Sequence, residues 1–82
     1  MNHELKIQSE YFVAVINKTK TFEIRNNDRD FKVGDKIILR EIDSCGRYTG
    51  RSAFRKITYI TDYAQQKNYV VMAIKGLDEE AE

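Results

Sequence analysis

The chain has 82 residues, which is the length of one small domain and leaves no room for a second hydrophobic core. Hydrophobic residues make up 41% and charged residues 33%, a balance typical of a globular domain and not of a disordered chain. The sequence holds no apolar run near the roughly 20 residues that cross a bilayer, and its start lacks the features of a secretory signal. We therefore expect a cytoplasmic domain that does not associate with membranes.

The net charge of +1 hides an uneven distribution of charge along the chain. Residues 78–82 hold four carboxylates and no base, and the nine other acids face 14 Lys and Arg residues, a balance of +5. Residues 18–56 by themselves also carry +5. The sequence thus predicts one domain over residues 1–77 and an acidic, disordered tail over residues 78–82. A basic domain suits a polyanionic ligand, although ordinary solubilising surface charge explains the same count.

The single cysteine, Cys45, has no partner for an internal disulfide and lacks the neighbouring Cys and His residues of a zinc site. The sequence also contains no glycine-rich loop of the kind that holds phosphates. We therefore expect neither a metal ion nor a cofactor.

The hydrophobic pattern predicts one helix and about five strands. Residues 3–7 alternate as a short strand, and Ser9 resembles the N-cap of an amphipathic helix over residues 10–17. Turn residues and a long loop over residues 43–50 separate the remaining predicted strands. These strands cover residues 21–25, 36–42, 53–61 and 69–75. The last of them is apolar on both faces, which predicts a central place in the sheet.

One short helix cannot supply the crossovers that a doubly wound parallel sheet needs. With so little chain, the strands bury most surface by curling into a small barrel with the helix packed against one side. We therefore predict an α+β, mainly β fold: a small β-barrel of about five strands with one short N-terminal helix. Apolar side chains from the helix and the strands fill its predicted interior: Phe12, Val15, Ile16, Phe22, Ile24, Leu39, Ile57, Val71 and Ile74.

Glu23 and Arg25 lie two residues apart on a predicted strand, so both side chains leave the face opposite the predicted interior. A carboxylate that only accepts hydrogen bonds, beside a guanidinium with a fork of donors, can recognise a planar polar group such as a nucleobase. Lys20 has the opposite parity and joins them only at the fraying start of the strand or across a bulge. The alternative is that Glu23 and Arg25 pair with each other, or with charges across the sheet such as Arg40 or Glu41.

Lys20, Glu23 and Arg25 also fit the K-x-x-E-x-R part of the G-x-K-x-x-E-x-R signature of ASCH domains, which belong to the PUA-like superfamily. The order of further short motifs over roughly residues 3–75 resembles a small bacterial and phage-associated ASCH-like domain of unknown function. These motifs are His3-Glu4-Leu5-Lys6, Asn27-Asp28-Arg29, Val33-Gly34-Asp35, Leu39-Arg40-Glu41 and Tyr48-Thr49-Gly50-Arg51. Lys18 occupies the position of the signature's glycine, so Asn17 or Lys18 must make the turn that ends the helix.

The resemblance implies a PUA-like pseudo-barrel with a cleft beside the signature strand, in a superfamily associated with RNA and modified nucleosides. Some small ASCH proteins are amidohydrolases that remove the acetyl group from N4-acetylcytidine with a lysine, a threonine and a glutamate. Lys20 matches that lysine, but Glu23 occupies the position of the threonine, so the matching hydroxyl is absent. A catalytic role would therefore need Lys20 and Glu23 to activate water together.

We expect a non-catalytic, monomeric binding module for RNA or for a nucleoside- or nucleotide-like ligand. Lys20, Glu23 and Arg25 would form its cleft, with four further candidates around it: Arg40, Tyr48, Arg51 and His3. Tyr48 would stack on a base and Arg51 would clamp a phosphate, unless both only build a turn. His3 would contact the ligand or act as a satisfied polar cap at the strand end.

Two other hypotheses stay open at this point. The first is a small amidohydrolase that acts on an acylated nucleoside, with Lys20 and Glu23 as its catalytic pair. The second is a protein-interaction domain of phage or bacterial origin, in which the signature residues only stabilise the barrel.

Overall fold

The computed structural model describes residues 1–77, so the predicted tail over residues 78–82 lies outside the described residues. Within residues 1–77 the chain forms one helix and a single five-stranded sheet with the strand order β1-β3-β4-β5-β2. The elements are β1 (Asn2–Gln8), α1 (Ser9–Ile16), β2 (Phe22–Asn26), β3 (Lys36–Ile42), β4 (Tyr48–Thr61) and β5 (Tyr69–Gly76). β1 and β3 are parallel, and the other neighbouring strands are antiparallel.

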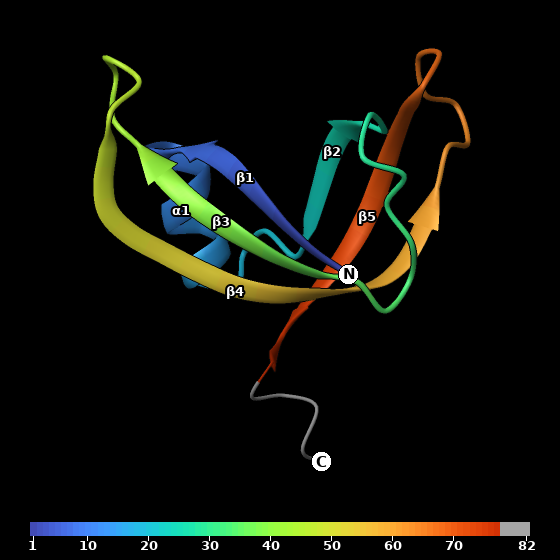
Figure 1. The fold of residues 1–82 in the computed structure, drawn as a ribbon, viewed down its shortest axis with the longest axis horizontal. Coiled ribbons are helices and arrows are strands. Elements are labelled where there is room, and N and C mark those ends of the chain that lie inside the picture. The colour runs from blue at the N-terminus through green and yellow to red at the C-terminus, as the bar shows by residue number, and fades with distance from the viewer. Residues whose placement is uncertain (78–82) are drawn as a thin grey trace.

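The sheet curls because β4 is long and strongly bent, with β3 and β1 beside one part of it and β5 and β2 beside the other (Figure 1). The result is a half-barrel with β1 and β2 as its two edges. The predicted mainly β fold with five strands and one N-terminal helix is thus confirmed. β5 is an inner strand between β4 and β2, but the central strand of the five is β4 and not β5 as predicted.

α1 follows β1 directly and buries Phe12 and Val15 against β1, β3 and β4. Ser9 is the first helical residue and not the N-cap, and its hydroxyl donates a hydrogen bond to the carbonyl of Ile42 (3.1 Å). Lys18 makes the left-handed turn after the helix, with φ of 62°, whereas Asn17 stays right-handed. No helix within residues 1–77 has the length and the apolar character needed to cross a membrane.

The core lies on the inner face of the sheet, which is the face that packs against α1. Its buried side chains are Leu5, Ile7, Phe12, Val15, Phe31, Ile37, Leu39, Ala53, Ile57, Val70, Met72 and Ile74. The predicted interior was wrong for Ile16, Phe22 and Ile24, which are 48%, 41% and 50% exposed. It was also wrong for Val71, which is only half-buried.

The parity of β2 explains most of this error. Glu23 lies directly opposite Met72 of β5, and Ile24 lies opposite Val71. Because β5 presents Met72 to the core, β2 presents Glu23 to the core as well and turns its apolar residues outward. The predicted inside and outside of this strand are therefore exchanged.

The predicted long loop over residues 43–50 is a short turn over residues 43–47, and β4 begins at Tyr48. The Asp43 carboxylate accepts hydrogen bonds from the backbone N–H groups of Cys45 and Arg47, both at 2.9 Å. Gly46 supplies the positive φ of 81° that this turn needs. Because the turn satisfies its own backbone groups, the chain re-enters the sheet five residues earlier than the pattern predicted.

Candidate ligand-binding site at the open seam of the sheet

The two edges of the half-barrel are joined by the side chains of Arg25 in β2 and of Arg29 in the segment after β2, and not by backbone hydrogen bonds between β1 and β2. Arg25 Nη2 donates to the carbonyl oxygen of Lys6, and Arg29 Nη1 donates to the carbonyl oxygen of Glu4, both at 2.8 Å. Residues two apart on a strand direct their carbonyls to the same side, so both arginines bind the edge of β1 that β3 leaves open. We call this edge-to-edge gap the seam.

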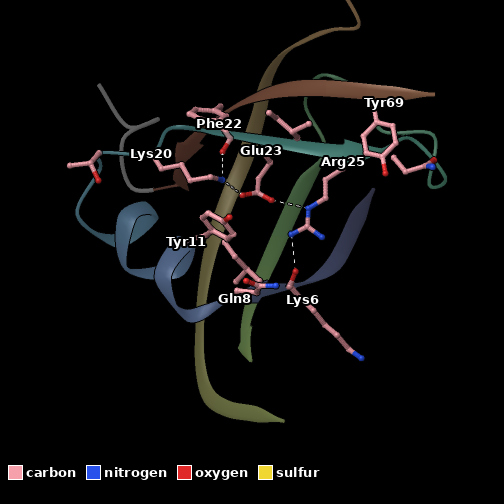
Figure 2. A pocket seen from close by; sticks show the side chains of 12 residues that line it. Lys6, Gln8, Tyr11, Lys20, Phe22, Glu23, Arg25 and Tyr69 are labelled. Carbon is pink, nitrogen blue, oxygen red and sulfur yellow. Dashed lines mark hydrogen bonds and ion pairs between the residues drawn. The ribbon is translucent and has the colours of Figure 1, made fainter. Parts of the chain in front are cut away.

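A pocket of about 730 Å³ opens along the seam, lined by the end of β1, the start of α1, the segment before β2, and β2 itself. This volume lies within the range of sites that hold small molecules. Three aromatic rings stand among the lining residues: Tyr11, Phe22 and Tyr69 (Figure 2). We call this cavity the seam pocket.

The polar centre of the seam pocket is the Glu23 carboxylate, which is only 3% exposed. Lys20 Nζ donates to Oε1 of Glu23, and Arg25 Nε donates to Oε2 at 2.8 Å (Figure 2). Lys20 precedes β2, so its long side chain can reach Glu23 in spite of its opposite parity. A buried carboxylate requires such partners because an unpaired charge is costly away from water.

This cluster keeps hydrogen-bonding capacity for a ligand. Lys20 uses one further N–H on the carbonyl of Phe22 (2.6 Å), so two of its three donors have protein acceptors. Arg25 uses Nε and Nη2 on protein oxygens and has further N–H groups. One carboxylate between two cations leaves a net positive charge, which favours ligands rich in carbonyl or anionic oxygens.

Aromatic faces lie next to these charges. The ammonium of Lys20 is 4.9 Å from the centroid of the Phe22 ring and 5.9 Å from that of Tyr11. The seam pocket therefore combines a polar edge with flat apolar walls.

Arg40 and Tyr48 are brought together, but not at the seam pocket. The Arg40 guanidinium stacks over the Tyr48 ring at 3.9 Å from its centroid and pairs with Glu4 at 3.0 Å. Lys6 Nζ lies 5.8 Å from the same ring. Neither Arg40 nor Tyr48 lines the seam pocket.

Arg51 is engaged in a separate ion pair, with the buried residue Glu41. Its Nε and Nη2 donate to the two carboxylate oxygens of Glu41, each at 2.7 Å, and Thr49 Oγ1 donates to Oε1 at 2.6 Å. Glu41 is 1% exposed. The hydrogen bonds from Arg51, and then from Thr49, lower the pKa of Glu41 from 4.5 to about 2. These contacts hold the start of β4 against β3. They agree with the alternative hypothesis that Arg51 builds the turn and does not contact a ligand.

His3 lies near the start of β1, whereas the end of that strand lines the seam pocket. His3 is 5% exposed, and its Nε2 lies 2.8 Å from Oδ2 of Asp35. The ring packs edge-on against Phe31 at 4.8 Å between centroids. The hydrogen bond to His3 lowers the pKa of Asp35. His3 is thus a satisfied polar group that ties β1 to the turn before β3.

Among the four outlying candidates, none contributes to the seam pocket, while Lys20, Glu23 and Arg25 all do. The suggested pairing of Glu23 or Arg25 with Arg40 or Glu41 is wrong, because those two residues have partners of their own. The pairing of Glu23 with Arg25 is present.

Sequence reasoning missed the aromatic walls of the seam pocket. Phe22 was assigned to the interior, and Tyr69 was predicted only as part of the strand over residues 69–75. Tyr11 lies one turn before the buried Val15 in α1 but is 47% exposed, so it is a large aromatic residue left at the surface beside the core. Within residues 1–77 no three side chains of His, Cys, Asp or Glu gather as a metal site would require.

The fold and this site define a small half-barrel domain with a charged pocket between its edge strands. The chain belongs to the family described as "Domain of unknown function (DUF3850)", whose model matches residues 2–74. It is also similar to the "Uncharacterized 12.9 kDa protein in GpA 3'region" of Escherichia phage P2, with 37% identity over 71 residues. That alignment covers 85% of this chain and 64% of the phage protein. The chain therefore spans less than two thirds of the length of that relative.

The predicted resemblance to a phage-associated domain of unknown function is confirmed at the level of this family. The family match runs from the start of β1 into β5 and so includes every strand that contributes to the seam pocket.

Proposed function

We propose that the protein is a binding module for a nucleobase-bearing ligand, either a nucleoside or nucleotide or a base of RNA, held in the seam pocket. The cluster of Lys20, Glu23 and Arg25 carries this proposal, because it holds a carboxylate and two cations at the centre of a pocket with aromatic walls. A base offers an edge of donors and acceptors and a flat π-face. The charged cluster would bind the edge, and Tyr11, Phe22 or Tyr69 would contact the face.

The resemblance to ASCH domains supports the same proposal. In a PUA-like barrel the strand that carries K-x-x-E-x-R borders the ligand cleft, and in this protein β2 borders the seam pocket. We accordingly propose an ASCH-like, PUA-like domain that acts in the cytoplasm, where nucleotides and RNA are available.

The contacts of the cluster favour binding over hydrolysis. A general base must accept a proton, whereas Lys20 donates to a carboxylate and to a carbonyl. Thr19 is the lining residue with an aliphatic hydroxyl, and its Oγ1 donates to the carbonyl of Ala14 at 3.1 Å. Neither group is arranged to activate a nucleophile.

An NMR titration with the common nucleosides and an N-acylated cytidine tests the proposal. The amide signals of the pocket walls should shift on addition of at least one nucleoside. Arg25→Lys should weaken that binding by about 1–3 kcal/mol, because lysine cannot reproduce the fork that joins Glu23 to β1. Arg47→Lys, an exposed change in the turn before β4, is the matched control and should leave binding unchanged.

Three outcomes would contradict the proposal. Absence of amide shifts at millimolar nucleoside and with short RNAs would show that the protein does not bind this class of ligand. Equal weakening of binding in Arg25→Lys and Arg47→Lys would show that the ligand does not bind in the seam pocket. Hydrolysis of the acylated nucleoside that disappears in a folded Lys20→Ala variant would replace the binding module by an amidohydrolase.

A further inference from the structure

Three lysines stand in register on neighbouring strands, far from each other in the sequence. Lys36 of β3 lies directly opposite Lys56 of β4, and Lys56 lies opposite Lys75 of β5. The adjacent residues Ile37, Ile57 and Ile74 are buried in the core, so the lysines leave the opposite, outer face of the sheet. Neighbouring strands are about 4.8 Å apart, so this lysine row spans roughly 10 Å.

The outer face concentrates positive charge. Among the strand residues that the structure describes, the side chains with outward parity include Lys6 and Arg40 besides the lysine row, and Glu4 is the one carboxylate among them. Glu4 is paired with Arg40 at 3.0 Å. The buried strand carboxylates Glu23 and Glu41 face the core, where they do not neutralise this surface.

Exposed aromatic rings flank the lysine row along β4. Phe54 precedes it on the same face, opposite Ile38, and is 52% exposed. Tyr59 follows it, opposite Ala73, and is 66% exposed. The strand pairing shifts between Ile57 and Tyr59, and this bulge turns Tyr59 to the outer face, where regular alternation would direct it inward.

We propose that the outer face binds single-stranded nucleic acid, with the lysine row on the phosphates and with Phe54 and Tyr59 stacked on bases to either side. Alternating basic and aromatic groups match a single strand, because its phosphates and its base faces are both accessible. A duplex would use the charges but conceal its base faces from the rings. This surface lies on the face of the sheet opposite the inward-pointing Glu23, and the proposal does not depend on the seam pocket.

Fluorescence anisotropy with a fluorescein-labelled oligouridylate of about 12 nucleotides tests this surface, since such strands fit known single-strand site sizes. Wild-type affinity should fall with salt with a log–log slope near −2, as expected for about three phosphate contacts. The triple variant Lys36→Gln/Lys56→Gln/Lys75→Gln should bind about ten-fold more weakly or worse at low salt, with a slope near zero. Its thermal unfolding should remain a single cooperative transition, which shows that the variant is folded.

The matched control is Lys32→Gln/Arg47→Gln/Lys67→Gln, which removes the same number of charges from turns outside the outer face. It should change affinity less than about three-fold, and its slope should stay close to wild type. Tyr59→Leu and Phe54→Leu should each weaken binding about ten-fold without a change in slope, because stacking is not ionic.

Equal losses in the two triple variants would overturn the proposal, as would an absence of oligouridylate binding at low salt. So would equally tight, row-dependent binding of polyglutamate or of phosphatidylserine vesicles, which would show attraction by charge alone. Oligouridylate binding that depends on the lysine row, together with a failed nucleoside titration, would support this surface and contradict the seam pocket's proposed ligand.

Discussion

Glu23 shows how one residue links the stability of this domain to its site. The sequence pattern predicted that Glu23 and Arg25 leave the face of β2 that points away from the core. The structure reverses this expectation, since Glu23 is buried beside Met72 and depends on Lys20 and Arg25 for its hydrogen bonds.

Arg25→Ala should therefore destabilise the protein by about 1–3 kcal/mol, because Glu23 loses a charged partner and the carbonyl of Lys6 loses its donor. Urea unfolding followed by circular dichroism measures the change. Arg47→Ala, whose side chain is 77% exposed, is the control and should stay within about 0.5 kcal/mol of wild type. An Arg25→Ala curve that overlays the control would mean that the guanidinium does not support the seam.

Glu41 should make the protein sensitive to acid. The pKa of Glu41 is about 2 in the folded chain, and its ordinary value of 4.5 applies in the unfolded chain. The unfolded chain therefore binds the proton more readily. The stabilisation by the Glu41 carboxylate is complete above pH 4.5 and disappears as the pH falls towards 2.

Melting temperatures of wild type and Glu41→Gln over this pH range test the point. The variant should be less stable near neutral pH and should approach wild type in acid. Some acid dependence should remain in the variant, because the pKa of Asp35 is also lowered. Two parallel curves would show that Glu41 does not titrate as its contacts with Arg51 and Thr49 require.

At the scale of the elements, two turns contain a residue with a positive φ, which alanine does not favour and glycine readily adopts. Ala64, in the exposed turn between β4 and β5, has φ of 59°, and Gly34, before β3, has φ of 96°. Alanine pays about 1–2 kcal/mol in the left-handed region, whereas glycine adopts it without strain.

Ala64→Gly should therefore leave stability unchanged or raise it by up to about 1 kcal/mol, in spite of the greater entropy of the unfolded chain. Gly34→Ala should lower stability by about 1 kcal/mol or more, although no atom lies within 4 Å of the added Cβ. Chemical denaturation of both variants gives the comparison. A loss of more than about 1 kcal/mol in Ala64→Gly would contradict the left-handed turn.

The core of the whole molecule spans both parts of the curled sheet, from Leu5 in β1 to Met72 in β5. Ile57 is completely buried at its centre, whereas Ile24 is 50% exposed on the outer side of β2. Ile57→Ala should cost about 2–5 kcal/mol, and Ile24→Ala should cost less than about 1 kcal/mol.

Thermal unfolding followed at two wavelengths measures both variants and checks that one cooperative transition remains, as expected for a single core. Comparable losses in the two variants would restore the original parity of β2, with Ile24 in the interior. That result would also place Glu23 outside the core and remove the physical basis of the seam pocket.

Local patterns in the sequence predicted the helix and all five strands of this protein, although β4 begins five residues earlier than predicted. The turn residues on either side predicted β3 with the correct bounds, and the spacing of Phe12 and Val15 predicted the buried face of α1. The resemblance to the K-x-x-E-x-R signature grouped Lys20 with Glu23 and Arg25, although strand parity alone placed Lys20 on the other face.

The tertiary structure alone decided which face of each strand turns inward and which charges meet. Alternation has a period of two and is equally satisfied by either parity, so the pairing of β2 with β5 had to select the inward residues. The same long-range pairing separates Arg40, Tyr48 and Arg51 from the seam pocket and aligns the lysine row. Strand register depends on contacts between residues distant in sequence, and for that reason no local pattern contained it.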